Sequence, residues 1–187
     1  DGQDLINGGC VWWDGRDLVK GGVFWDGRDL VKGGVFWDGR DAAGEFHVPD
    51  GTKIVAGGAF YGNTALTAVW FPDSVAWIGP GALKGCESLR QVVWPGGITV
   101  AEAEVFSGCV RLAEVSCRQI RLEGDFHSVS IPIPWQIIKE RAFYNCRSLC
   151  HISLEHVRTV GKEAFKGCAS FLPGKADVLS QAGESAF

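Results

Sequence analysis

Apolar residues recur along this chain in a pattern whose copies lie 23 residues apart. Each copy begins with a short run of β-branched and aromatic residues that ends at a proline, as in Val69–Phe71 before Pro72 and Val92–Trp94 before Pro95. Such residues favour strands, and proline is tolerated at the end of a strand better than in its interior. A turn, a short apolar segment, a Gly-Cys or Asn-Cys step and a leucine follow. We predict short helical turns at Ala82–Leu83, Val105–Phe106, Ala142–Phe143 and Ala164–Phe165.

The same spacing holds at several positions of the copy at once. The positions in phase are Pro49, Pro72 and Pro95; Phe60, Leu83 and Phe106; Asn63, Cys86 and Cys109; and Leu66, Leu89 and Leu112. The pattern returns as Phe143, Cys146 and Leu149, and 22 residues later as Phe165, Cys168 and Phe171. A fixed period of this length indicates one supersecondary unit stacked on copies of itself. We therefore assign the in-phase residues to the core.

A single copy is too small to fold alone. Its five or six inward apolar side chains contribute on the order of 1.5–3 kcal/mol each. Ordering its backbone costs about 1–2 kcal/mol per residue. Stacking copies about 4.8 Å apart lets strands pair and cores merge, so the array is stable where its unit is not.

The repeat resembles the leucine-rich repeats of bacterial surface proteins of the BspA type, including the 23-residue repeats of treponemal members. The runs that carry the resemblance are WIGPGALKGCESLRQVVWP, ERAFYNCRSLCHISL and VGKEAFKGCASF. It covers about residues 45–173. It implies an α/β solenoid wound as a right-handed stack, with a concave sheet of parallel strands and short helical turns on the convex side.

The period breaks once, between Cys109 and Cys146, which lie one repeat and fourteen residues apart. We interpret residues 118–128 as a truncated half-repeat or an inserted loop near Glu123–Asp125. An insertion there would overhang the concave face and alter what docks on it. Residues 174–187 lack the repeat signature, and we predict a polar C-terminal cap.

Residues 1–44 carry a different, shorter repeat. DGRDLVKGGVFW occurs identically at 14–25 and 26–37, and residues 1–13 are a diverged copy. Asp-Gly and Gly-Gly supply the positive φ of tight hairpin turns, so we predict an antiparallel β-meander. The Asp-Gly-Arg-Asp runs lack the alternating ligands of a calcium loop and fit turns better. Exposed strands of this composition also predict self-association into a homo-oligomer.

Composition and cysteine usage exclude several classes. The net charge of −4 with scattered basic residues gives no stripe for nucleic acid, and no apolar run is long enough for a membrane span. Seven cysteines leave at least one unpaired. Four of them share one phase of the repeat, which favours buried structural thiols over disulfides or metal ligands. Cys146, Cys150 and His151 resemble part of a zinc site, but the matching second pair is missing. We predict no metal and no cofactor.

Alternation along the strands gives a candidate binding face. If Val69 and Phe71 point inward, Ala68 and Trp70 point outward. The two outward columns are Glu45, Ala68, Gln91, Glu114, Ser128 and His151, and His47, Trp70, Val93, Ser116, Ser130 and Ser153. An outward tryptophan beside a valine is typical of a binding patch. The alternative is that the N-terminal repeats or residues 118–128 cover it. The predicted partner-binding residues are His47, Ala68, Trp70, Gln91, Val93, Glu114, Ser116, His151 and Ser153.

These observations favour a non-catalytic scaffold that binds a protein partner on its concave face. The four histidines fall in different phases, and no nucleophile–base pair, phosphate loop or dinucleotide motif occurs, so we predict no enzyme activity and no catalytic residues. Two alternatives remain. One is sugar binding through Trp12, Trp13, Trp25, Trp37 and Trp70; the other is self-assembly through the N-terminal strands. The family resemblance suggests a bacterial cell envelope, whereas the unpaired cysteines favour a reducing compartment such as the cytoplasm.

Overall fold

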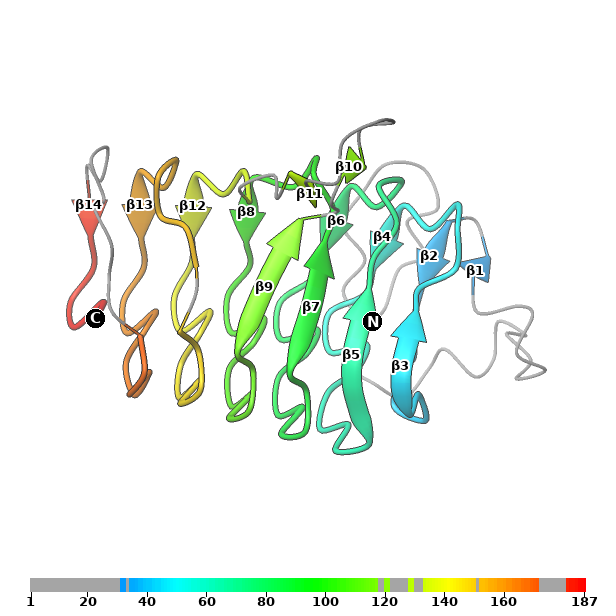
Figure 1. Ribbon diagram of the computed structural model, residues 1–187, viewed down its shortest axis with the longest axis horizontal. Coiled ribbons are helices and arrows are strands. Elements are labelled where there is room, and N and C mark those ends of the chain that lie inside the picture. The colour runs from blue at the N-terminus through cyan, green and yellow to red at the C-terminus, as the bar shows by residue number, and fades with distance from the viewer. Residues whose placement is uncertain are drawn as a thin grey trace, which may run out of the picture.

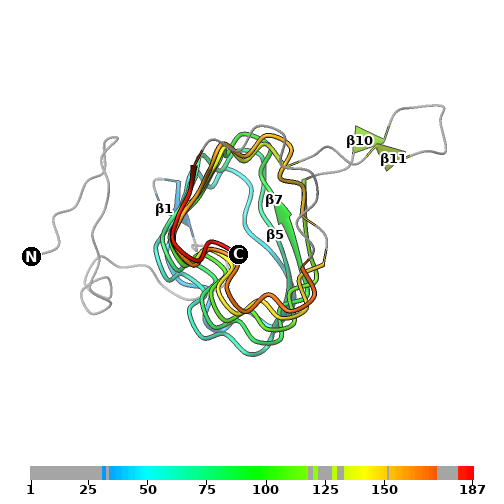
Figure 2. The same ribbon diagram turned by 90° about the vertical axis from the view of Figure 1, so that its left-hand side faces the viewer.

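The computed structural model describes residues 31–32, 34–117, 120–121, 128–129, 133–150, 152–171 and 181–187. Their backbone winds into stacked coils; the coils up to β9 carry a strand on each of two sides of the stack, and the later ones carry a short strand on one side (Figure 1). Seen along the stack, successive coils superpose on one closed outline (Figure 2). Of the meander predicted over residues 1–44, residues 1–30 lie outside the described residues.

Four parallel strands form the sheet of longest strands. They are β3 (Gly44–His47), β5 (Leu66–Trp70), β7 (Gln91–Trp94) and β9 (Glu114–Cys117), in that order across the sheet. Phe46 pairs with Val69, Val69 with Val92, and Val92 with Val115. Each step is one repeat of 23 residues, so the period in the sequence is the register of the sheet. The predicted parallel solenoid is confirmed.

Shorter parallel strands line the other side of the coils. They are β2 (Val35–Phe36), β4 (Ile54–Val55) and β6 (Trp77–Ile78), then β8 (Val100–Ala101), β12 (Ile137–Ile138), β13 (Thr159–Val160) and β14 (Gln181–Ala182). β14 lies within the segment predicted as a cap and pairs in register with β13. β1 (Val31–Lys32) pairs antiparallel with β2, whereas β2 pairs parallel with β4. The parallel stack thus begins before residue 45.

The break in the period is absorbed without disturbing the stack. Val100 of β8 pairs with Ile137 of β12, across 37 residues of chain. In the interval, β10 (Ile120–Arg121) and β11 (Ser128–Val129) form a separate antiparallel pair. This pair lies outside the outline of the coils (Figure 2). The stack therefore continues from β8 to β12 in register across the break in the period.

The predicted helical turns are wrong: no helix occurs in the described part of the chain. Alternate amides of these segments donate across the stack instead, as from Leu83 N to Val105 O at 3.0 Å and from Gly85 N to Ser107 O at 2.8 Å. The φ angles of Gly81 and Gly85 are positive, at 60° and 76°. Positive φ every four residues interrupts the α conformation. The fold is therefore an all-β solenoid and not the α/β solenoid that the resemblance implies.

The in-phase cysteines are structural thiols, as predicted. Cys86 Sγ donates to Phe60 O at 3.0 Å, Cys109 Sγ to Leu83 O at 3.0 Å, and Cys146 Sγ to Phe106 O at 3.1 Å. Cys168 repeats the contact on Phe143 O at 3.0 Å. Each thiol thus satisfies a carbonyl of the preceding coil. All six described cysteines are free thiols.

Asn63 occupies the cysteine position in the first coil of this series. Its Nδ2 donates to Gly39 O at 2.9 Å and to Ala42 O at 2.7 Å, and its Oδ1 accepts from the amides of Ala65 and Leu66. A carboxamide that both donates and accepts can hold an irregular preceding segment, which a thiol cannot do.

Candidate functional site

The outward side chains of β3, β5, β7 and β9 form two columns, which we term the long-strand face; it is the concave face of the sequence analysis. Ala68 pairs with Gln91, and Gln91 with Glu114. In the second column His47 pairs with Trp70, Trp70 with Val93, and Val93 with Ser116. The first four members of each predicted column therefore lie side by side on neighbouring strands.

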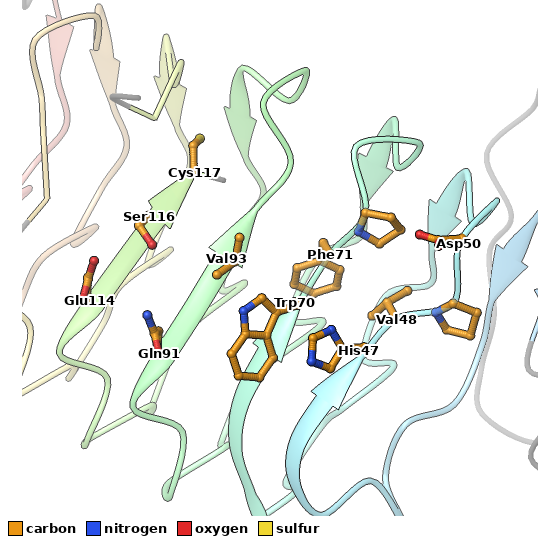
Figure 3. A pocket seen from close by; sticks show the side chains of 12 residues that line it. His47, Val48, Asp50, Trp70, Phe71, Gln91, Val93, Glu114, Ser116 and Cys117 are labelled. Carbon is orange, nitrogen blue, oxygen red and sulfur yellow. The ribbon is translucent and has the colours of Figure 1, made fainter. Parts of the chain in front are cut away.

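The long-strand face is hollowed into a groove of about 640 Å³. Figure 3 shows its side chains rising from the strands and from the turns beyond β3 and β5. The lining residues are His47, Val48, Pro49, Asp50, Trp70, Phe71, Pro72, Gln91, Val93, Glu114, Ser116 and Cys117. Six of these belong to the predicted binding set.

Two aromatic rings dominate the groove. The imidazole of His47 stacks on the indole of Trp70, with ring centroids 4.5 Å apart and planes 4° from parallel. His47 is exposed and Trp70 is partly exposed. Parallel registration of β3 and β5 brings the two rings together, because each is the last outward residue of its strand. The stack places both aromatic rings side by side in the lining of the groove.

The remaining predicted residues do not join the groove. Ala68 is only 6% exposed, because its methyl group lies between the longer side chains of Glu45 and Gln91. Ser153 lies outside any strand, and its Oγ accepts from the amide of Glu155 at 3.4 Å. Ser128 pairs with Arg121 in β10–β11 and not with β9. His151 lies outside the described residues.

The groove also includes residues that the sequence argument missed. Pro49, Asp50 and Pro72 come from the turns after β3 and β5, and Cys117 ends β9. The recurring Pro-Asp step at Pro49–Asp50 and Pro72–Asp73 was the available signal. Burial raises the pKa of the Cys117 thiol, and the negative charge of Asp73 raises it further. The field of an acidic turn therefore reaches the edge of the groove.

Among the described residues, no group of three or more His, Cys, Asp and Glu side chains is placed to hold a metal ion. That part of the chain also has no helix that could cross a membrane. The groove presents an aromatic stack, a valine, small polar groups and carboxylates.

Six copies of the BspA type leucine-rich repeat region match the chain, over residues 39–125 and 121–187. The chain belongs to the BspA-type leucine-rich repeat family. No curated protein sequence matches the chain significantly.

Solved structures of bacterial leucine-rich repeat proteins share the fold. A leucine rich cell surface protein from Faecalibacterium prausnitzii A2-165 is 27% identical, with a TM-score of 0.57 over 75% of this chain and 32% of that one. The leucine rich repeat protein of T. pallidum is also 27% identical, with a TM-score of 0.55 over 74% of this chain and 68% of that one. One from Eubacterium ventriosum ATCC 27560 is 19% identical, with a TM-score of 0.57 over 76% and 42%. This BspA-type chain thus spans about a third of the length of the F. prausnitzii protein and about two fifths of the length of the E. ventriosum protein.

Proposed function

We propose that this BspA-type chain is a non-catalytic scaffold that binds a protein partner on its long-strand face. The observation that carries the proposal is the groove of about 640 Å³ built around the His47–Trp70 stack. A partly exposed tryptophan in a groove, with small side chains beside it, has the form of an interface anchor.

The energetics of the stack favour the same role. Folding alone gains little from leaving a tryptophan partly in water, whereas covering it with a partner removes apolar area worth about 25 cal/mol per Å². The parallel ladder of β3, β5, β7 and β9 holds the ring without a flexible loop. Binding of a partner therefore costs little entropy for ordering the side chains of the site.

We further propose a place at the bacterial cell envelope. The support is the F. prausnitzii relative, which is described as a leucine rich cell surface protein. This chain spans only 32% of that protein, so the location of the relative is not carried over as a finding and the location of this chain is proposed separately. Fractionation of the bacterial cells followed by immunoblotting tests it: recovery of the chain in the cytoplasmic fraction and not in the envelope fractions would contradict it.

Paired variants test the long-strand face. Trp70→Ala removes the anchor, and Tyr61→Ala removes a 57% exposed aromatic from a turn outside the groove. Proteins captured from bacterial and host extracts by the wild-type chain should be lost with Trp70→Ala and kept with Tyr61→Ala. Equal capture by all three chains would overturn the proposal. A glycan array distinguishes the sugar alternative: Trp70-dependent glycan binding without protein capture would replace protein recognition by carbohydrate recognition.

A further inference from the structure

The indole of Trp70 has one covered face and one open face. His47 on β3 stacks against the first, and Val93 is the neighbour of Trp70 on the opposite side, on β7. The open face is therefore turned toward Val93. Because valine is much shorter than tryptophan, a notch lies over Val93 with the indole as its wall (Figure 3).

The other sides of this notch are polar or acidic. Gln91 lies two residues before Val93 on β7. Ser116 on β9 is the strand partner of Val93. Glu114 pairs with Gln91 and is exposed beside the notch. An amide oxygen, a hydroxyl and a carboxylate thus surround a small apolar floor beside an indole face.

With His47 counted as neutral, the formal charges of the groove lining have one sign. Asp50 and Glu114 are acidic, and none of the lining residues is a lysine or an arginine. Arg90 immediately precedes β7 and does not line the groove. The chain as a whole carries a net charge of −4. Complementarity therefore favours a cationic partner over an acidic one.

We propose that the notch over Val93 receives an arginine or lysine side chain of the partner; this rests on the proposed binding function of the long-strand face. The methylene stem packs on Val93, and the cationic head lies against the open face of Trp70. A tryptophan face is the best aromatic site for a cation. Glu114 accepts from the head group, and a guanidinium can engage the carboxylate with two N–H groups while stacking on the indole. His47 keeps the indole upright and closes its other face.

The test uses two peptides, acetyl-Gly-Ser-Arg-Ser-Gly-amide and the same peptide with citrulline, which keeps the shape of arginine and removes its charge. Each is titrated into the full ¹⁵N-labelled chain, and the Trp70 indole N–H resonance is followed. We expect binding of the arginine peptide to be about tenfold tighter, because the citrulline peptide lacks both the cation–π and the carboxylate interaction. Glu114→Gln should weaken only the arginine peptide. Equal affinities, or no shift of the Trp70 resonance with the arginine peptide, would overturn the proposal.

The variants Trp70→Ala and Glu114→Gln distinguish failure of the cationic notch from failure of partner binding by the long-strand face. Glu114→Gln changes an exposed carboxylate to its neutral isostere and should leave the thermal unfolding midpoint unchanged. If partner capture is lost with Trp70→Ala but kept in full with Glu114→Gln, the long-strand face still binds and the cationic notch is wrong. If neither variant affects capture, the binding function itself fails. An arginine-poor, acidic segment cross-linked at position 93 would also contradict the cationic notch.

Discussion

The rings of His47 and Trp70 stack 4.5 Å apart on neighbouring strands, in register across β3 and β5. Aromatic pairs of this kind contribute about 0.5–1.5 kcal/mol beyond the area that they bury. A double-mutant cycle with His47→Ala, Trp70→Ala and the double variant should therefore give a coupling free energy in that range. Urea unfolding monitored by far-UV circular dichroism provides the measurement. Additivity of the two changes would show that the stack does not stabilise the fold.

Asn63 is expected to be worth more to stability than the thiols that follow it in phase. The Asn63→Ala variant loses four hydrogen bonds to backbone groups at a site that is 4% exposed. We expect a loss of about 2–4 kcal/mol in the free energy of unfolding. Cys109→Ala removes one buried thiol and its hydrogen bond to Leu83 O, so we expect about 1–2 kcal/mol. Urea unfolding of both variants checks the order, and a larger loss for Cys109→Ala would contradict it.

Glycines at the close contacts between coils should not tolerate alanine. A Cβ built on Gly161 would lie 2.5 Å from Glu140 N of the preceding coil, whereas one on Gly96 would meet nothing within 4 Å. Neither glycine has a positive φ, so the comparison isolates the packing. We expect Gly161→Ala to destabilise by more than about 2 kcal/mol, from overpacking against backbone, and Gly96→Ala to change little. Thermal unfolding of both variants gives the answer, and equal midpoints would refute this account of the stacking.

Acid should weaken the contact between the last coils. Hydrogen bonds from Lys166 and Arg141 lower the pKa of Glu163 from 4.5 to about 2. Arg141 Nε lies 2.7 Å from Glu163 Oε2, across neighbouring coils. A lowered pKa means that the stabilisation is complete above pH 4.5 and is lost as the pH falls toward 2. The wild-type chain should therefore lose more stability than Glu163→Gln between pH 6 and pH 2.5, in parallel urea titrations. Identical losses would show that the ion pair contributes nothing.

The period in the sequence predicted the sheet register because stacked coils repeat contacts residue for residue. Phe46, Val69, Val92 and Val115 fall on one row for that reason. The same logic placed Trp70 between His47 and Val93. The helical turns were mispredicted because Ala82–Leu83 resembles the start of a helix, whereas the positive φ of Gly81 and Gly85 depends on hydrogen bonds to the next coil. Helix propensity along the sequence does not report these hydrogen bonds between coils.

The groove was predicted in part. The outward residues of the strands follow from alternation, but Asp50 and Cys117 enter the groove through the path of turns and strand ends. The near-parallel orientation of the His47 and Trp70 rings depends on side-chain rotamers that alternation does not specify. Ala68 is only 6% exposed, which alternation could not predict because it gives the direction of a side chain and not how far neighbouring side chains cover it.

The most direct test of the central claim is site-specific photo-crosslinking on the long-strand face. p-Benzoylphenylalanine is placed at Val93, within the groove, and in a second chain at Tyr61, on a turn outside it. Each chain is irradiated with bacterial or host extract, with unlabelled wild type or unlabelled Trp70→Ala as competitor. We expect adducts from position 93 that wild type suppresses and Trp70→Ala does not, and none of that kind from position 61. Adducts from position 61 with none from position 93, or equal suppression by both competitors, would contradict recognition by the long-strand face.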